Sequence, residues 1–441
     1  MQATVCTGRS EPHRRSREAT SRRTSLAALV GGRPAGRPRA PLPHRRRGRA
    51  RALRARRRRA RPRAGAALMF ETLADHLEIV WGALAGFAIV VVLTPAVGGV
   101  ARRLGAVDRP ERRRLNRQPV PRLGGLALFF GIFVPALAFL DLTHEARGLL
   151  LGAAVATVVG AIDDFRGLEW WQKLAGQVAA AAIPVGFGIW VHRFTFPIVG
   201  IHVLPKWIGM PLSVLWIVAI MNMVNFLDGL DGLAAGVSGI SAFTFALIAL
   251  SLARPEVQSA LLSAIVLGAA LGFLRHNFYP ARIFMGDSGA LLLGFVLAVI
   301  PLEGLLKTAS IVTLFFPLLV LAVPIVDTTF VVARRLKHGE KVFEADQAHL
   351  HYRFLRRGFS QVRATVYIWT WCALLAAAAL GTRFIRPHAH GHWHLWRAVG
   401  AAAIGLVALA ASVYMVYLLE IVKLASVRAR LRQERKPPRA A

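Results

Sequence analysis

Cysteine is almost absent from this sequence of 441 residues. The two cysteines, Cys6 and Cys372, lie in a charged terminal segment and in an apolar run. A disulfide framework needs more cysteines than this, and a cysteine-ligated metal site needs several of them. The scarcity therefore excludes disulfide scaffolds, cysteine-based metal centres and thiol redox chemistry.

Negative charge is also scarce, because 23 acidic residues face 56 basic ones. The first 67 residues alone contain 21 arginines and two glutamates. A segment this rich in Arg, Pro and Ala cannot bury a core, so we expect residues 1–68 to form a disordered extension. A transit peptide and a basic arm for nucleic acid or anionic lipid are the alternatives. We instead expect no nucleic-acid partner, and we expect translation to begin at Met69 and to leave 1–68 out.

Apolar residues dominate the rest of the chain. They make up 55% of the sequence, and the mean hydropathy is +0.47. They gather in blocks of roughly twenty residues, the length of a helix that crosses a bilayer. The pattern predicts an all-α integral membrane protein with about eleven transmembrane helices. The expected spans lie near 77–100, 123–142, 148–165, 172–192, 209–227, 231–252, 257–275, 288–306, 310–333, 364–383 and 396–420.

The distribution of basic residues indicates which loops lie on the cytoplasmic side of the membrane. The loop after the first expected span carries eight Arg against two acids, and the loop after the ninth is also basic. Loops on the other side, such as 141–148 and 253–258, are short and nearly balanced. Because cytoplasmic loops are enriched in Lys and Arg, the odd-numbered loops are predicted to be cytoplasmic. We expect a membrane domain over 69–425 in the bacterial inner membrane and a basic cytoplasmic tail over 426–441.

The stretch MNMVNFLDGLDGLAAG (221–236) ends an apolar run with four polar side chains at every third position, Asn222, Asn225, Asp228 and Asp231. This spacing puts the two asparagines on roughly one helix face. A capped helix end followed by a turn would also explain the pattern. Ionisable groups at membrane depth are costly, however, and usually mark a functional site.

Three further polar clusters fall beside odd-numbered loops, so the four together predict one active site on the cytoplasmic face. Asp163 and Asp164 end an apolar run, and one of them could be held ionised while its neighbour acts as a base. Asp287 lies between two glycines in FMGDSG, where the backbone can approach a ligand closely. Oxygen ligands without cysteine suit Mg²⁺ or Mn²⁺ better than zinc, and Mg²⁺ commonly joins carboxylates to substrate phosphates.

The fourth cluster is HLHYR, with His349, His351 and Arg353, and Arg356 follows it. These residues could form a solvated surface patch. Near a metal ion and a diphosphate, imidazole and guanidinium groups could instead bind phosphate oxygens. We favour a substrate clamp.

Three rival functions remain open from the residues alone. GDSG also surrounds the nucleophile of serine proteases, but here Ser288 opens an apolar helix without convincing partners. A transporter would place its ionisable groups near the midplane and in two related halves, and no internal repeat is seen. The acids instead cluster at one membrane boundary, with Asp327 as the exception. Asp327 could be a buried helix-pairing group or an outer partner of the site, and we assign it no catalytic role. A lipid-binding scaffold would explain the positive charge but not the aspartates.

Five motifs, taken in order, resemble those of the polyprenyl-phosphate N-acetylhexosamine-1-phosphate transferases. The resemblance covers about residues 75–425. It implies a multi-helix membrane enzyme that moves a sugar-1-phosphate from a UDP-sugar to undecaprenyl phosphate and releases UMP. A homodimer is left open. The motifs are PVPRLGG (119–125), DDFRGL (163–168), NMVNFLDGLDGLAAG (222–236), NFYPARIFMGDSG (277–289) and HLHYR (349–353).

The resemblance also implies roles for single residues. Asp287 matches a Mg²⁺ ligand, and one aspartate of the 163/164 pair matches a group proposed to deprotonate the lipid phosphate. Phe284 matches a position that stacks on uracil. The candidate catalytic residues are Asp163, Asp164, Asp228, Asp231, His349 and His351. The candidate substrate-binding residues are Lys173, Asn222, Asn225, Asn277, Phe284, Arg353 and Arg356.

Two departures from the family pattern bear on the sugar. Asn116 and Tyr352 stand where members often have His. The form with three histidines belongs to the branch that transfers phospho-N-acetylmuramoyl-pentapeptide. The sequence therefore resembles more closely the branch that uses UDP-N-acetylglucosamine or a related sugar to begin a cell-envelope glycan. The pentapeptide transferase is the alternative.

Overall fold

The structure of this chain is a computed structural model. It describes residues 65–108, 119–196, 200–252, 254–305, 318–338, 349–385, 388–389, 392–393 and 395–418, all within one compact unit, Arg63–Ala441. Three sequence predictions lie outside the described residues: the Arg-rich extension up to residue 64, Asn116 and the tail over 426–441. Helix α2 begins at Gly65, so the last four residues of the predicted extension, 65–68, lie in this helix.

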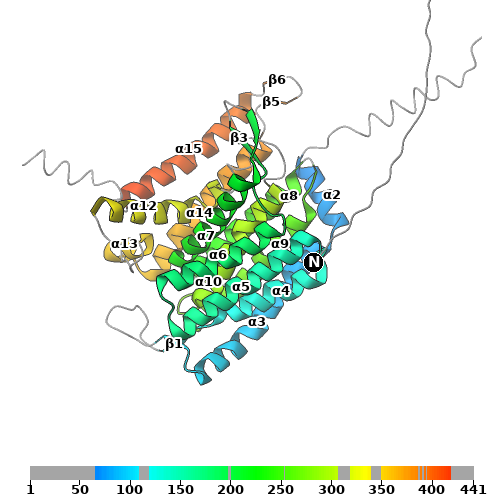
Figure 1. Cartoon of the computed structure of the whole chain (residues 1–441). Coiled ribbons are helices and arrows are strands. Elements are labelled where there is room, and N and C mark those ends of the chain that lie inside the picture. The colour runs from blue at the N-terminus through cyan, green and yellow to red at the C-terminus, as the bar shows by residue number, and fades with distance from the viewer. Residues whose placement is uncertain are drawn as a thin grey trace, which may run out of the picture. The chain divides into compact units, whose positions relative to one another are not determined.

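Helices form almost all of the described structure (Figure 1). The strands form three antiparallel pairs at the ends of the bundle, β1 (Val107–Asp108) with β2 (Val120–Pro121), β3 (Arg193–Phe196) with β4 (Gly200–Val203), and β5 (His388–Ala389) with β6 (His392–Trp393). The helices are α2 (Gly65–Asp75), α3 (Glu78–Arg103), α4 (Gly124–Phe139), α5 (His144–Arg166), α6 (Trp170–Gly186), α7 (Lys206–Leu227), α8 (Leu233–Ser251), α9 (Val257–Asn277), α10 (Gly286–Ile300), the π-helical turn η1 (Pro301–Leu305), α12 (Ala322–His338), α13 (Leu350–Arg356), α14 (Gln361–Phe384) and α15 (Leu395–Leu418).

Eight helices among the described residues are long and apolar enough to cross a membrane, which confirms the predicted all-α membrane fold. They are α3, α5, α7, α8, α9, α10 with its continuation into η1, α14 and α15. The other three predicted spans meet the shorter helices α4, α6 and α12. The count of eleven spans is therefore not confirmed.

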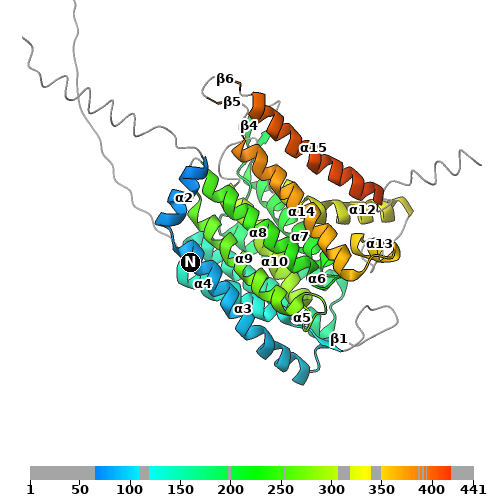
Figure 2. The ribbon, with the colours of Figure 1, turned by 180° about the vertical axis from the view of Figure 1, so that it is seen from behind.

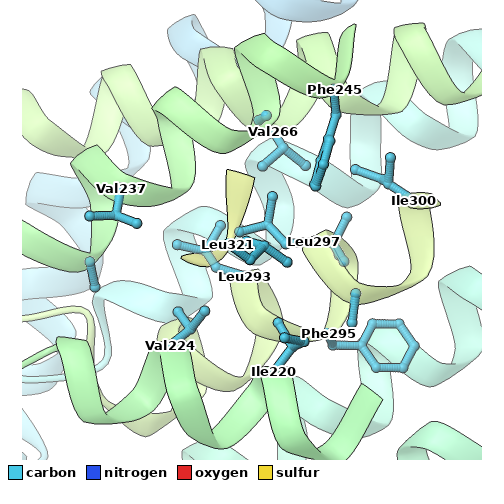
Figure 3. Packing of buried hydrophobic residues seen from close by; sticks show 14 of the residues in the cluster. Ile220, Val224, Val237, Phe245, Val266, Leu293, Phe295, Leu297, Ile300 and Leu321 are labelled. Carbon is cyan, nitrogen blue, oxygen red and sulfur yellow. The ribbon is translucent and has the colours of Figure 1, made fainter. Parts of the chain in front are cut away.

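Helix α10 is the core of the bundle. Every residue from Ser288 to Ile300 is buried, because α4, α5, α7, α8 and α9 surround it. Figure 3 shows its side chains, among them Leu293 and Phe295, packed among residues of α7, α8 and α9. Burying a large apolar side chain stabilises the fold by about 1.5–3 kcal/mol, so this packing fixes where α10 begins. By contrast, α15 lies at the edge beside α14, with most of its apolar surface exposed (Figure 2).

Chain direction brings the polar motifs to one end of the bundle. Helices α5, α7 and α9 end there, whereas α6, α8 and α10 begin there. Local signals in the sequence set several of these boundaries. The hydroxyl of Thr143 accepts the N–H of Ala146 at the opposite end of α5, and Glu169 forms a capping box with Gln172 at the start of α6. The turns between the helices thus carry the four clusters that the sequence singled out.

Candidate active site

Lys173 joins three of the predicted motifs. Its ammonium nitrogen lies 2.8 Å from Asp163 Oδ2 and 2.8 Å from Asp287 Oδ1, and it donates to Asn225 Oδ1 at 3.2 Å. The amide of Asn225 also donates to Asp287 Oδ1. These four residues come from α5, α6, α7 and α10, so the packing of four helices creates a single ionic centre.

Asp164 has a different task from its neighbour Asp163. Its carboxylate accepts the backbone N–H groups of Asp287 at 2.8 Å and of Ser288 at 3.0 Å, and the Ser288 hydroxyl at 2.8 Å. It therefore caps the first turn of α10, whose N–H groups have no partner within the helix. Gly286 has φ +70°, and a side chain there would meet the Asp164 carboxylate. Ser288 is buried and belongs to this cap, which leaves the protease interpretation without support.

The motif PVPRLGG holds the segment before α10 by its backbone. Phe284 N–H donates to Pro121 at 2.9 Å, Gly124 N–H donates back to Phe284 at 2.9 Å, and Gly125 N–H donates to Met285 at 2.8 Å. A side chain at Gly124 would meet the Phe284 carbonyl at 2.7 Å. The motif thus acts as a backbone cradle for the residues that precede Asp287. Phe284 itself is half-buried beside this cradle.

The aspartates of the stretch 221–236, Asp228 and Asp231, occupy the turn between α7 and α8. Asp231 accepts the N–H of Ala281 at 2.9 Å, and burial raises the pKa of its carboxyl. Burial, followed by the negative charges of Asp287 and Asp164, raises the pKa of Asp228 to about 8. The acidic side chains of this cluster therefore outnumber the ammonium of Lys173, and their crowding favours the protonated form of Asp228.

This charge imbalance bears on the predicted metal ion. Among the described residues, no group of three or more His, Cys, Asp or Glu side chains is arranged to enclose a metal. Mg²⁺ needs less than that, because it often takes one or two carboxylates together with phosphate oxygens. The donor set beside Asp287 consists of carboxylate and amide oxygens, which Mg²⁺ and Mn²⁺ prefer. The residues therefore fit an ion that is shared with a diphosphate.

Two predicted substrate-binding amides are engaged within the protein. Asn277 is 2% exposed; its Oδ1 accepts Gly232 N–H at 3.0 Å and its Nδ2 donates to Ile283 at 2.9 Å. Asn222 donates to Gln177 Oε1 at 2.7 Å and accepts from its Nε2 at 3.2 Å. Both amides tie helices and turns together beneath the ionic centre, and a contact of either with substrate stays a prediction. Sequence reasoning missed Gln177, although it lies one helical turn after Lys173.

The motif HLHYR begins the short helix α13, which packs against the end of α7. The His349 ring stacks on Phe226 with 5.0 Å between ring centroids, and His351 is 2% exposed beside Gly229. The Arg353 guanidinium lies 4.2 Å from the centre of the Phe330 ring of α12. Arg356, in the last turn, is exposed. The structure thus brings the histidines to the acidic turn and directs Arg353 toward α12.

Acid should weaken the packing of His351. Neither ring nitrogen of this buried side chain has a hydrogen-bond partner among the described residues, and burial lowers its pKa from 6.5 to about 4. The neutral ring contributes its full stability above pH 6.5, and the contribution is lost as the pH falls from 6.5 toward 4. Between pH 7.5 and 5, we expect the thermal unfolding temperature to fall further for the wild type than for His351→Gln. Equal falls would show that His351 is not buried as a neutral ring.

An apolar cavity of about 500 Å³ lies between α6 and α7 and is open to the outside of the bundle, where Val178 and Leu215 are exposed. On α6 it begins at Leu174, the residue after Lys173, and it continues to Gly186 at the other end of the helix. One end of the cavity therefore lies at the same end of α6 as Lys173. The lining residues are Leu174, Val178, Ala182, Val185, Gly186, Met210, Pro211, Val214, Leu215 and Val218.

Comparison with known proteins gives consistent matches. Residues 146–305 match the model of "Glycosyl transferase family 4". The chain is 37% identical over 295 residues to the "Probable undecaprenyl-phosphate N-acetylglucosaminyl 1-phosphate transferase" of Bacillus subtilis, covering 66% of this chain and 82% of that protein. It is 33% identical over 358 residues to the "Decaprenyl-phosphate N-acetylglucosaminephosphotransferase" of Mycobacterium leprae, covering 74% of this chain and 90% of that protein. It is 32% identical over 329 residues to the "Phospho-N-acetylmuramoyl-pentapeptide-transferase" of Desulforudis audaxviator, covering 67% of this chain and 95% of that protein.

Proposed function

This chain belongs to glycosyl transferase family 4. From that premise we propose that it transfers a sugar-1-phosphate from a UDP-sugar to undecaprenyl phosphate. The sugar is N-acetylglucosamine or a related N-acetylhexosamine. UMP is the second product, and the lipid-linked sugar begins a cell-envelope glycan. The observation that carries the proposal is the centre formed by Lys173, Asp163 and Asp287 at the end of an apolar cavity. It offers charge for phosphates and an adjoining surface for a lipid.

Transfer of a phosphoryl group depends on positioning and charge neutralisation more than on covalent work by the protein. Lys173 supplies a fixed positive charge beside the acids, suited to the oxygens of a diphosphate. Asp287, with Asn225 beside it, would hold Mg²⁺ or Mn²⁺. When bound, such an ion would neutralise charge on the diphosphate and ease the departure of UMP.

Asp163 is the residue of the aspartate pair suited to act on the acceptor. Its Oδ2 faces Lys173 and its Oδ1 accepts the N–H of Leu168 at 2.7 Å, whereas both oxygens of Asp164 are taken by the first turn of α10. Asp163 would keep the lipid phosphate fully ionised, so that one of its oxygens attacks the sugar-linked phosphorus. A two-step route, in which a carboxylate first takes the phosphoryl group, is the alternative mechanism.

The cavity between α6 and α7 suits the acceptor's hydrocarbon chain. Its lining residues are apolar, and it begins directly beside Lys173. A polyprenyl phosphate lying there would have its phosphate at the ionic centre and its chain along the bundle. The positive loops beside the site favour a cytoplasmic location, where UDP-sugars are available.

Two other functions are less well supported. The pentapeptide transferase of Desulforudis audaxviator is less similar than the Bacillus subtilis protein, and HLHYR lacks the third histidine of that branch. A transporter would need ionisable groups near the membrane midplane. Here Asp163, Asp228 and Asp287 gather where α5 and α7 end and α10 begins.

The direct test uses purified protein in lipid or detergent with undecaprenyl phosphate and several UDP-sugars. We expect release of UMP with UDP-N-acetylglucosamine or another UDP-N-acetylhexosamine, and no release without the lipid. Turnover only with UDP-N-acetylmuramoyl-pentapeptide would support the alternative. Absence of turnover with every donor would contradict the proposal.

The choice of sugar should depend on the HLHYR helix. The aspartates serve phosphate and metal, which all UDP-sugars share, whereas Arg353 and Arg356 carry donors suited to an N-acetyl or hydroxyl group. A site rejects a wrong substituent chiefly when its own polar groups are left unpaired. Arg353→Ala should therefore lower kcat/KM for the preferred UDP-sugar more than for a competitor. As a control, a conservative change at Phe284 should lower kcat/KM equally for all uridine donors. If Arg353→Ala lowered kcat/KM by the same factor for every donor, this helix would only bind the diphosphate.

A further inference from the structure

A buried carboxylate on α12 lies outside all five motifs. Asp327 is 3% exposed, and both of its oxygens are used by α13. Oδ1 accepts the backbone N–H of Leu350 at 2.9 Å, and Oδ2 lies 3.1 Å from Nδ1 of His349. One side chain of a bundle helix thus holds both the first backbone N–H of α13 and the histidine directly before it. The pairing spans 22 residues of sequence.

The contact with Oδ2 determines which nitrogen of His349 carries the proton. An ionised carboxylate can only accept hydrogen bonds, so Nδ1 must donate. In a neutral imidazole the proton on Nδ1 leaves the lone pair on Nε2, so this nitrogen accepts from a substrate hydroxyl and donates to a phosphate oxygen only once it is protonated. An ionised carboxylate in this place would therefore fix the tautomer of His349 as well as its position.

The His349 ring is held on its face as well as at its edge. Phe226 stacks on it at 5.0 Å between centroids with 29° between ring planes, and Phe226 lies two residues before Asp228. The rings of His349 and His351 are nearly parallel, 6.0 Å apart. A change in the orientation of His349 would therefore alter the packing of Phe226, beside the acidic turn, and of His351.

We propose that Asp327 is a positioning residue of the transfer reaction, which acts by fixing the tautomer and orientation of His349. This inference rests on the proposed transferase function. It differs from a purely structural role, in which Asp327 would only cap the start of α13. The two roles predict different behaviour of the same substitutions.

Asp327→Asn separates these roles. The amide oxygen can still accept the Leu350 N–H, which preserves the cap, whereas the amide NH₂ now donates to Nδ1 of His349 and moves the ring proton to Nε2. We expect kcat/KM to fall by roughly 10- to 100-fold, the usual effect of losing an outer partner that orients an active-site imidazole. Thermal stability should change little.

Thr328→Val is the matched control. Thr328 is the next residue on α12, and its hydroxyl is buried with no hydrogen-bond partner among the described residues. The substitution keeps the shape of the side chain and leaves both contacts of Asp327 in place. Activity and the state of His349 should remain those of the wild type.

A double substitution tests whether Asp327 acts through His349. If it does, adding Asp327→Asn to His349→Gln should change kcat/KM by less than about threefold, because the shared interaction is already lost. A structural role alone would make the two losses multiply. Multiplied losses would overturn the proposal.

Nitrogen-15 spectra of histidine-labelled protein provide a readout independent of turnover. The His349 signals are those missing from His349→Gln. We expect a proton on Nδ1 in the wild type and in Thr328→Val, and a proton on Nε2 in Asp327→Asn. If the wild type is active and His349 keeps its tautomer in Asp327→Asn, the proposal is overturned. If the wild type itself turned over no UDP-sugar, the transferase function would fail first and the positioning role would fail with it.

Discussion

Asp287→Asn should abolish turnover while the protein stays folded in the membrane. Asp287 is the residue on which Lys173 and Asn225 converge, and its carboxylate is the predicted ligand of Mg²⁺. A neutral amide is a poor ligand for a hard cation, and it no longer balances the ammonium of Lys173. We expect a loss of roughly 10³-fold or more in kcat, of the size seen when electrostatic stabilisation of a transition state is removed. The measurement is UMP release at saturating donor and acceptor.

The fold should survive because the backbone of residue 287 carries the structural contact. Its N–H donates to Asp164 whatever the side chain, and α10 remains surrounded by its neighbours. Asp141→Asn is the matched control, since this exposed carboxylate accepts only from Gln258 in the contacts described. It should keep wild-type activity. Near-normal activity of Asp287→Asn in excess Mg²⁺ would remove Asp287 from the metal site.

Metal dependence gives a second measure of the same centre. A chelator should stop the wild-type enzyme, and Mg²⁺ or Mn²⁺ should restore it, whereas Zn²⁺ should not, because the donors are oxygens. Binding of Mn²⁺ to the wild type and to Asp287→Asn can be compared directly without turnover. Equal affinity in the two proteins would contradict the assignment.

The membrane helices could be predicted from the sequence because their signal is local. Apolar runs of about twenty residues specify a spanning helix without reference to the rest of the chain. The count of eleven was not confirmed where the helices are shorter than the runs, as in α4 and α6, since packing and turns decide where such a helix ends. The convergence of the polar motifs was predictable for a related reason, because alternating spans return to the same side.

Contacts between distant residues were beyond the sequence. Asp327 was considered as a helix-pairing group or an outer partner of the site, but its partner His349 could not be identified, because the residues between them show no common pattern. Gln177 was missed because its pairing with Asn222 depends on how α6 lies on α7. The motif PVPRLGG was noticed by resemblance, but its backbone bonds to Phe284 and Met285 follow only from the fold.

The aspartate pair illustrates the same limit, since two adjacent and identical residues receive opposite tasks. Successive residues on a helix point about 100° apart, so one carboxylate faces Lys173 and the other faces the start of α10. The sequence indicated that both belong to the site. Only the position of α10, more than a hundred residues later in the chain, separates the proposed reacting group from the cap.

Substitutions of the two aspartates should therefore differ in kind. Asp163→Asn should lower kcat by roughly 10²- to 10⁴-fold, the usual contribution of a general base, at every Mg²⁺ concentration. Asp164→Asn should destabilise the protein by about 1–2 kcal/mol, because an amide is a weaker cap for the N–H groups of Asp287 and Ser288.

Part of the activity of Asp164→Asn should return with more Mg²⁺, since its defect is a loosened Asp287. Ser288→Ala is the control for the cap, because it removes one contact of Asp164 and leaves both carboxylates in place. It should resemble Asp164→Asn in direction, with a smaller fall in thermal stability and no fall in kcat of the size expected for Asp163→Asn. The measurements are kcat across a Mg²⁺ titration and thermal unfolding of each variant. If both aspartate variants were fully rescued by Mg²⁺, neither carboxylate would act as a base, and the acceptor phosphate would have to be ionised without help from this pair.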